Sequence, residues 1–107
     1  VMKSIYDYLK GYARSNPRNL AVVDEEKELN YGELYDSVIC LGAYYIKKGY
    51  SNDSVVILYM DNCVEWMIAF YTFLCIGCKV SFLSSKASAK ELYDVSNDLS
   101  TDMVVRK

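Results

Sequence analysis

The chain opens with apolar residues at the three- and four-residue spacing of a helix, while charged residues occupy the opposite face. The apolar set is Met2, Ile5, Tyr6, Leu9, Tyr12 and Ala13. This pattern predicts an amphipathic helix over residues 2–15. The helix is expected to end at Asn16-Pro17, because the residue before a proline disfavours helical geometry.

Two short apolar segments follow on either side of a charged turn at residues 24–26. They predict a β-hairpin over residues 20–30. Asn30 stands three residues before Glu33, which is the spacing of a capping box. A second helix is therefore expected over residues 31–49, where Gly49 supplies the left-handed residue at the end.

Residues 54–60 form a continuous aliphatic run, Ser-Val-Val-Ile-Leu-Tyr-Met. Such a run is typical of a strand that is covered on both faces, so helices are expected on either side of it. A third helix follows, with Asp61 or Asn62 as its N-cap. It is expected to run to Ile76 and to end at Gly77.

The remaining residues continue the alternation of strands and helices. Residues 79–83 and 103–105 are apolar strand segments, and the Ser88–Glu91 capping box opens a helix that is expected to run to Asp98. The order strand, helix, strand, helix, strand over residues 54–105 predicts right-handed parallel crossovers. The expected fold class is therefore α/β, a partial layered sheet with parallel strand-helix-strand crossovers after an N-terminal helix and hairpin.

The third expected helix is apolar on every side, as is typical of a helix inside a large protein. In one small α/β unit, a helix lies on the outside of the sheet. We therefore expect one face of this helix to remain uncovered and the chain to self-associate, or to bind a neighbour, through that face. Unpaired edge strands favour the same outcome.

Composition limits the classes of partner. The 107 residues are 52% hydrophobic and 24% charged, which is sufficient for one packed domain over residues 1–107. A net charge of -2 and dispersed cations argue against nucleic acid as a partner. The longest nearly apolar run, residues 66–78, is shorter than the ~20 residues of a membrane span. The N-terminus lacks the apolar core of a signal peptide, so a cytoplasmic protein is expected.

The four cysteines and the absence of histidine exclude imidazole catalysis and mixed Cys/His zinc sites. Cys75 and Cys78 have the spacing of a redox or metal pair. However, Cys75 lies at the end of an apolar helix, where the helix dipole disfavours a thiolate, and Cys40 and Cys63 do not form a second pair. We interpret the pair as small buried apolar residues.

Two motifs resemble those of adenylate-forming enzymes, the superfamily of acyl-CoA synthetases and adenylation domains. Residues 29–34, Leu-Asn-Tyr-Gly-Glu-Leu, resemble the family's Leu-Thr-Tyr-x-Glu-Leu motif. Residues 74–83 resemble its Leu-Lys-Ala-Gly-x-x-x-x-Pro motif, with Cys75 and Ile76 in place of Lys-Ala and without the final proline. Asn62–Glu65 stands where the family often has Asn-Ser-x-Glu, so the resemblance covers nearly the whole chain.

The resemblance implies that the chain is the N-terminal part of an ATP-dependent ligase. Such enzymes join a carboxylate to the α-phosphate of ATP, release pyrophosphate and pass the acyl group to a thiol of coenzyme A or of a carrier protein's phosphopantetheine. ATP, Mg and coenzyme A are implied for the complete ligase, whose remainder is the implied partner. The aromatic and aliphatic segment Trp66–Phe70 favours an acyl-CoA synthetase over the alternative, an amino-acid adenylation domain of a peptide synthetase.

The family's phosphate-binding loop, acidic ribose ligand and late catalytic lysine have no counterpart among these residues. The five glycines are isolated and form no phosphate loop. We therefore expect no catalytic, cofactor-binding or metal-binding residue in this chain, and we interpret both motifs as architecture.

Two other classes of protein remain open. Residues 22–26 and 59–61 imitate the acidic magnesium pocket of a receiver domain, in which an aspartate accepts a phosphoryl group. The helix before the first strand and the hairpin after Asp24 argue against this hypothesis. The other alternative is a non-catalytic interaction module, which the coding sequence beyond Lys107 would distinguish from part of a ligase.

Overall fold

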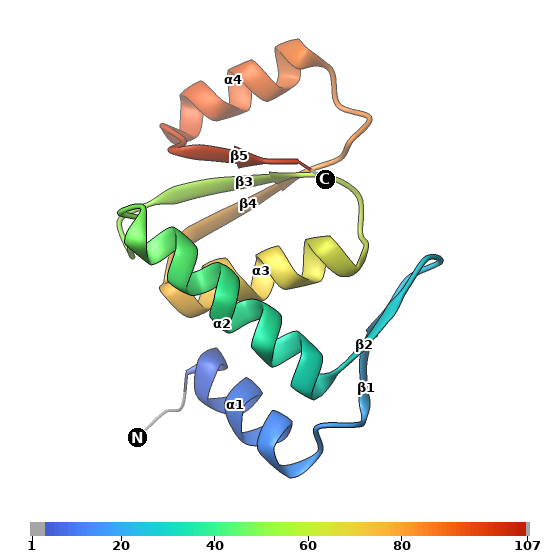
Figure 1. Cartoon of the computed structure of the whole chain (residues 1–107). Helices are drawn as coiled ribbons and strands as arrows, with labels where there is room; N and C mark the ends of the chain where they lie inside the picture. The colour runs from blue at the N-terminus through green and yellow to red at the C-terminus, as the bar shows by residue number, and fades with distance from the viewer. Residues whose placement is uncertain (1–3, 107) are drawn as a thin grey trace.

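A computed structural model describes residues 4–106, and this part of the chain contains four helices and five strands (Figure 1). The structure therefore follows the expected order of elements from the first helix to the last strand. In chain order the elements are α1 (Ile5–Ser15), β1 (Leu20–Val23), β2 (Glu28–Asn30), α2 (Tyr31–Lys47), β3 (Val55–Tyr59), α3 (Val64–Ile76), β4 (Lys79–Leu83), α4 (Ala89–Leu99) and β5 (Met103–Val105). Met2 and Lys3, which were expected in the first helix, lie outside the described residues.

The strands form two separate sheets. β1 and β2 pair antiparallel, which confirms the expected hairpin. The other three strands form a parallel sheet in the order β4-β3-β5, with Ile57 opposite Ser81 on one side and Val104 on the other. The alternating pattern of residues 54–105 thus correctly predicted a parallel sheet, in which the structure places β3 at the centre.

Helices cover both faces of this sheet. α4 lies on one face and α3 on the other, with α2 and α1 beyond α3 (Figure 1). Three consecutive residues of β3, Val56, Ile57 and Leu58, have 0% of their surface exposed. A strand whose successive side chains point to opposite faces buries all three only when both faces are covered, as its sequence predicted.

The third helix, α3, lies between two hydrophobic cores. Phe73 and Ala69 pack with Val56 and Leu58 of the sheet. Val64 packs with the first two helices and the hairpin, together with Met67, Ile68 and Tyr71. The expectation that one face of this helix is left uncovered is therefore wrong, because α1 and α2 cover the side that faces away from the sheet. Among the described residues, the large apolar side chains that are exposed lie on other elements.

Local sequence signals place most helix ends. The Asn30 side chain accepts a hydrogen bond from the Glu33 amide, and the Glu33 carboxylate accepts one from the Asn30 amide, which confirms the capping box. Gly49 and Gly77 adopt φ values of 101° and 96°, in the left-handed region that favours glycine. Gly77 therefore ends α3 as the sequence predicted, whereas α2 ends at Lys47, two residues before the expected end at Gly49.

Two details of the caps differ from expectation. Neither Asp61 nor Asn62 caps α3, because Cys63 is its N-cap and accepts a hydrogen bond from the Trp66 amide. Ser88 caps α4 by accepting from the amide of Glu91, but the Glu91 carboxylate accepts from the Ser88 hydroxyl instead of its backbone amide. α4 continues one residue beyond Asp98. No helix within residues 4–106 has the length and apolar character to cross a membrane.

Candidate functional site

A crevice lies at the carboxyl ends of the parallel strands, where ligands bind in open α/β sheets. The loop after β3 leads to α3 on one face of the sheet, whereas the loop after β4 leads to α4 on the opposite face. A hollow of about 590 Å³ opens between the two loops, lined by Asp61, Trp66, Phe82 and Ser84 among others. This is the position in the fold at which a ligand site is expected.

Asp61 closes part of the crevice by joining the two loops. Its carboxylate accepts a hydrogen bond of 2.6 Å from the Ser85 hydroxyl and a longer one, 3.3 Å, from the Ser85 amide. These bonds hold the pKa of Asp61 below the usual value for an aspartate. The loop of residues 84–88 contains no glycine, and the Ser85 donors that an anion would need are already bonded to a carboxylate.

A neighbouring hollow is lined by Tyr59, at the end of β3, together with Arg106 and Ser85. The Tyr59 hydroxyl donates a hydrogen bond of 2.7 Å to the carbonyl oxygen of Ala87, in the loop before α4. The guanidinium of Arg106, which follows β5, lies 5.0 Å from the centre of the Tyr59 ring. This cation–π contact and the hydrogen bond together fix the loop and the end of β5 to the central strand.

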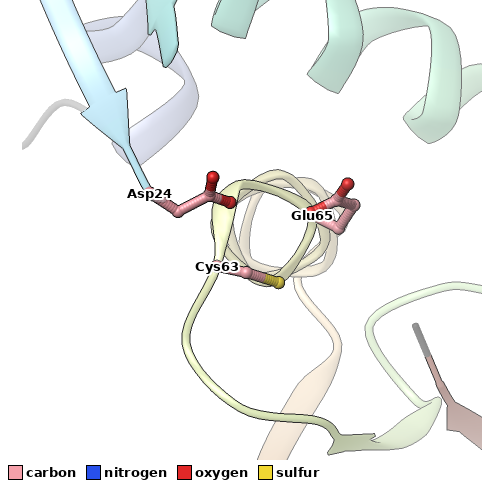
Figure 2. Close-up of side chains that lie close together, drawn as sticks. All are labelled: Asp24, Cys63 and Glu65. Atoms are coloured by element: carbon pink, nitrogen blue, oxygen red, sulfur yellow. The ribbon is translucent and has the colours of Figure 1, made fainter. Parts of the chain in front are cut away.

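A second polar cluster lies where the hairpin meets the N-terminus of α3 (Figure 2). Asp24, Cys63 and Glu65 each place one potential metal-ligand atom within 4.8 Å of the other two. Sequence analysis did not identify this group, because Asp24 lies some forty residues before the other two along the chain and only the fold brings them together.

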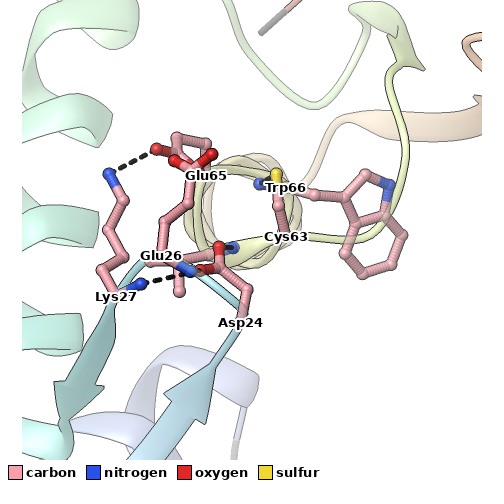
Figure 3. Close-up of polar contacts among 7 residues, drawn as sticks. Asp24, Glu26, Lys27, Cys63, Glu65 and Trp66 are labelled. Carbon is pink, nitrogen blue, oxygen red and sulfur yellow. Dashed lines mark hydrogen bonds and ion pairs between the residues drawn. The ribbon is translucent and has the colours of Figure 1, made fainter.

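The Asp24 carboxylate joins the hairpin turn to α3 (Figure 3). One oxygen accepts hydrogen bonds from the amides of Glu26 and Lys27, at 2.7 and 2.8 Å. The other accepts a bond of 2.8 Å from the amide of Val64, the first residue of α3. A carboxylate at this position is stabilised by the positive end of the helix dipole.

Lys27 and Glu65 form an ion pair beside this carboxylate (Figure 3). The hydrogen bond from Lys27 lowers the pKa of Glu65, and the same bond raises the pKa of Lys27. The second Glu65 oxygen is buried with no hydrogen-bond partner among the described residues. The Glu65 side chain as a whole is nevertheless 33% exposed, and its other oxygen is the one that pairs with Lys27.

This arrangement favours a structural clamp over a metal centre. A cation bound there would displace Lys27 and would face the positive end of α3, which opposes it. The receiver hypothesis also fails, because Asp24 follows a strand of the separate antiparallel sheet, whereas Asp61 follows the central parallel strand and is bonded to Ser85.

The residues of the two recognised motifs pack as architecture. Leu34 is 1% exposed, and the ring of Tyr31 lies 4.3 Å from that of Tyr12 on the first helix. Cys78 is buried, and its thiol donates a hydrogen bond to the carbonyl oxygen of Ser51. The interpretation of the pair as buried side chains is therefore confirmed for Cys78, whereas Cys75 is only partly buried. Burial raises the pKa of both thiols.

Comparison with known proteins identifies relatives over nearly the whole chain. The sequence model of the family described as AMP-binding enzyme matches residues 9–107. The nonribosomal peptide synthetase tcpP of Claviceps purpurea is 27% identical over 74 residues, which cover 69% of this chain and 4% of that protein.

Solved structures share the fold. The N-terminal domain of FACL13 from Mycobacterium tuberculosis, with an inhibitor bound, has a TM-score of 0.86 at 23% identity and matches 96% of this chain. VinN in complex with 3-methylaspartate has a TM-score of 0.90 at 19% identity over 98% of this chain. The N-terminal subdomain of Klebsiella oxytoca NpsA has a TM-score of 0.87 at 15% identity over 97%. The chain spans 26%, 29% and 27% of these three structures, respectively.

Proposed function

This chain belongs to the AMP-binding enzyme family, and we propose that it forms the N-terminal part of the large domain of an ATP-dependent carboxylate ligase. In this proposal the complete enzyme forms an acyl-adenylate and then transfers the acyl group to a thiol. The observation that carries the proposal is the family match over residues 9–107. The motif at residues 29–34 adds support, because its Asn30, Glu33 and Leu34 have the capping and packing roles inferred from the sequence.

The chain itself supplies scaffold in this proposal. An anion-binding helix start needs free backbone amides, but two amides in the first turn of α3 are bonded to Asp24 and Cys63. The donors of Ser85 are bonded to Asp61. Neither place therefore offers free donors to the phosphates of ATP, and for this reason we assign ATP, Mg and the thiol acceptor to the remainder of a cytoplasmic ligase.

Within the family, we propose an acyl-CoA synthetase-like enzyme. The support is the apolar segment Trp66–Phe70, whose Trp66 and Phe70 rings stack at 5.2 Å and contact Phe82 beside the crevice. The alternative is an amino-acid adenylation domain that serves a carrier protein. The name of the Claviceps purpurea relative, a peptide synthetase, favours this alternative.

Pyrophosphate exchange tests the proposal. The 107-residue chain is expected to show no exchange above a no-protein control with any acid of a broad panel. The chain extended by the residues that follow Lys107 in its gene is expected to exchange pyrophosphate with a subset of the acids. Product analysis with coenzyme A and with a carrier protein then separates the two acceptor classes. An extended product that exchanges with no acid would contradict the proposed activity, whereas exchange by the short chain would contradict its scaffold role.

A further inference from the structure

The outer surface of α2 carries an apolar strip. Ile39 and Ile46 are 39% and 60% exposed and lie two helical turns apart, with Ala43 between them. These three residues line a groove of about 380 Å³, together with residues of α1 and α3 that include Tyr6 and Cys75. The strip therefore forms one wall of an apolar groove on this face of the molecule.

Charges of opposite sign flank the strip. Asp36 lies in the N-terminal half of α2 and Lys47 at its C-terminal end, and both are exposed. They are eleven residues apart, which is close to three full turns, so they project from the same side of the helix. Lys47 lies in the last turn of α2, where the negative end of the helix dipole favours a cation.

We propose that this surface binds a second copy of the chain, with the two α2 helices packed antiparallel about a two-fold axis. If the axis passes between Gly42 and Ala43, Ile39 faces Ile46 of the partner subunit, because the two positions are equally far from the axis. Asp36 and Lys47 are not equally far from this axis, but Asp36 lies only about 3 Å along the helix from the level of Lys47 of the partner subunit, which long side chains span. Such an isologous contact requires a self-complementary surface, and both the apolar strip and the two charges meet this requirement.

The residues at the centre favour close packing of the two helices. Gly42 and Ala43 have little or no side chain, so the helix axes are free to approach to about 8 Å, the short end of the usual range. Antiparallel packing also brings opposite ends of the two helix dipoles together. Because the contact is limited to one helix and an adjoining groove, it belongs to the class of small interfaces, for which we expect a dissociation constant on the order of 100 μM.

The first test is the concentration dependence of mass in sedimentation equilibrium, over roughly 10–500 μM chain, a range that brackets the expected constant. The wild-type chain is expected to form dimers. Ile46→Lys is expected to raise the dissociation constant at least tenfold, since it places a charge in the apolar strip near a helix end that tolerates cations. Tyr93→Lys, at a 66% exposed site on α4, is the matched control and should leave the constant unchanged. A wild-type chain that remains monomeric, or equal effects of the two variants, would overturn the proposal.

A charge exchange tests the orientation. Asp36→Lys and Lys47→Asp are each expected to weaken dimerisation at low salt, because each homodimer then contains two pairs of like charges. An equimolar mixture of the two variants should dimerise again, since every lysine at one of these positions then meets an aspartate. Added salt should reduce this recovery. A mixture as monomeric as the separate variants would exclude the antiparallel register, even if Ile46→Lys had acted as expected.

Discussion

Asp24→Ala is the perturbation that most directly tests the clamp between the hairpin and α3. The substitution removes one carboxylate that accepts three backbone hydrogen bonds, from Glu26, Lys27 and Val64. Two of these bonds shape the turn between β1 and β2, and the third joins that turn to the start of the third helix. The variant therefore loses a local turn and a tertiary contact together.

The expected loss follows from the geometry of these bonds. A hydrogen bond to a charged group contributes about 1.5–3 kcal/mol, and loss of a helix-capping acceptor costs about 0.5–2 kcal/mol. Asp24 is only partly buried, so in the variant water can form some of the hydrogen bonds that the three amides lose. We therefore expect a decrease of about 2 kcal/mol in the free energy of unfolding. For a chain of this size, such a decrease lowers Tm by roughly 8–16 °C.

Urea unfolding followed by circular dichroism measures this difference. Glu25→Ala, at the exposed neighbouring position, is the control and should change stability by less than about 0.5 kcal/mol. Asp24→Asn keeps one carbonyl oxygen but loses the charge, so its stability should lie between those of wild type and Asp24→Ala. If Asp24→Ala unfolds at the same urea concentration as Glu25→Ala, the three hydrogen bonds do not stabilise the fold and the clamp interpretation fails.

Three further predictions concern other parts of the structure. Gly77→Val should lower the free energy of unfolding, measured in urea, by about 1 kcal/mol or more, because φ is 96° at this residue. Gly11→Ala should raise it by about 0.5–1 kcal/mol, because Gly11 lies in a helix with open space around the new methyl group. The pKa of Glu65 is lower in the folded chain than in the unfolded one. The ionised Glu65 therefore contributes to the free energy of unfolding at pH values above its unfolded pKa, and this contribution is lost as pH falls through its folded pKa. Glu65→Gln should flatten the acid limb of a curve of stability against pH. Alkylation should modify exposed Cys40 well before buried Cys78, and equal rates in the native chain would contradict this burial.

The sequence was most informative where the signal is local. β4 and β5 begin and end where the sequence predicted, and the glycine at the end of α3 has the expected left-handed backbone. These features depend on a few neighbouring residues, such as an apolar run between turns or a glycine after the last helical residue. Capping boxes are equally local, and Asn30 and Glu33 formed theirs as expected.

The candidate site was harder to predict from the sequence, because its contacts join residues that are far apart in the chain. Aspartate and asparagine are among the most favoured N-cap residues, and this led to the wrong choice of Asp61 or Asn62 for α3. In the structure the Asp61 carboxylate is bonded to Ser85, twenty-four residues later, and Asp24 supplies a carboxylate to the helix start from the hairpin. With the helix start already served by Asp24, the weak sulfur acceptor of Cys63 suffices as its own cap.

The prediction about α3 was wrong because the cover of this helix comes from segments that precede it in the chain. Its apolar residues surround the helix, which correctly indicated that it is covered on all sides. The expectation of an uncovered face considered only the sheet as cover. Yet α1 and α2 are amphipathic, and each must bury its own apolar face against another element. Among the helices of residues 4–106, α3 alone is apolar all round, so it is the surface that both can share, and Leu9 and Leu34 do pack with Val64 in one core. Because α3 is covered, the exposed apolar residues Ile39 and Ile46 lie on the outer side of α2. The contact between copies is therefore proposed for α2 instead of α3.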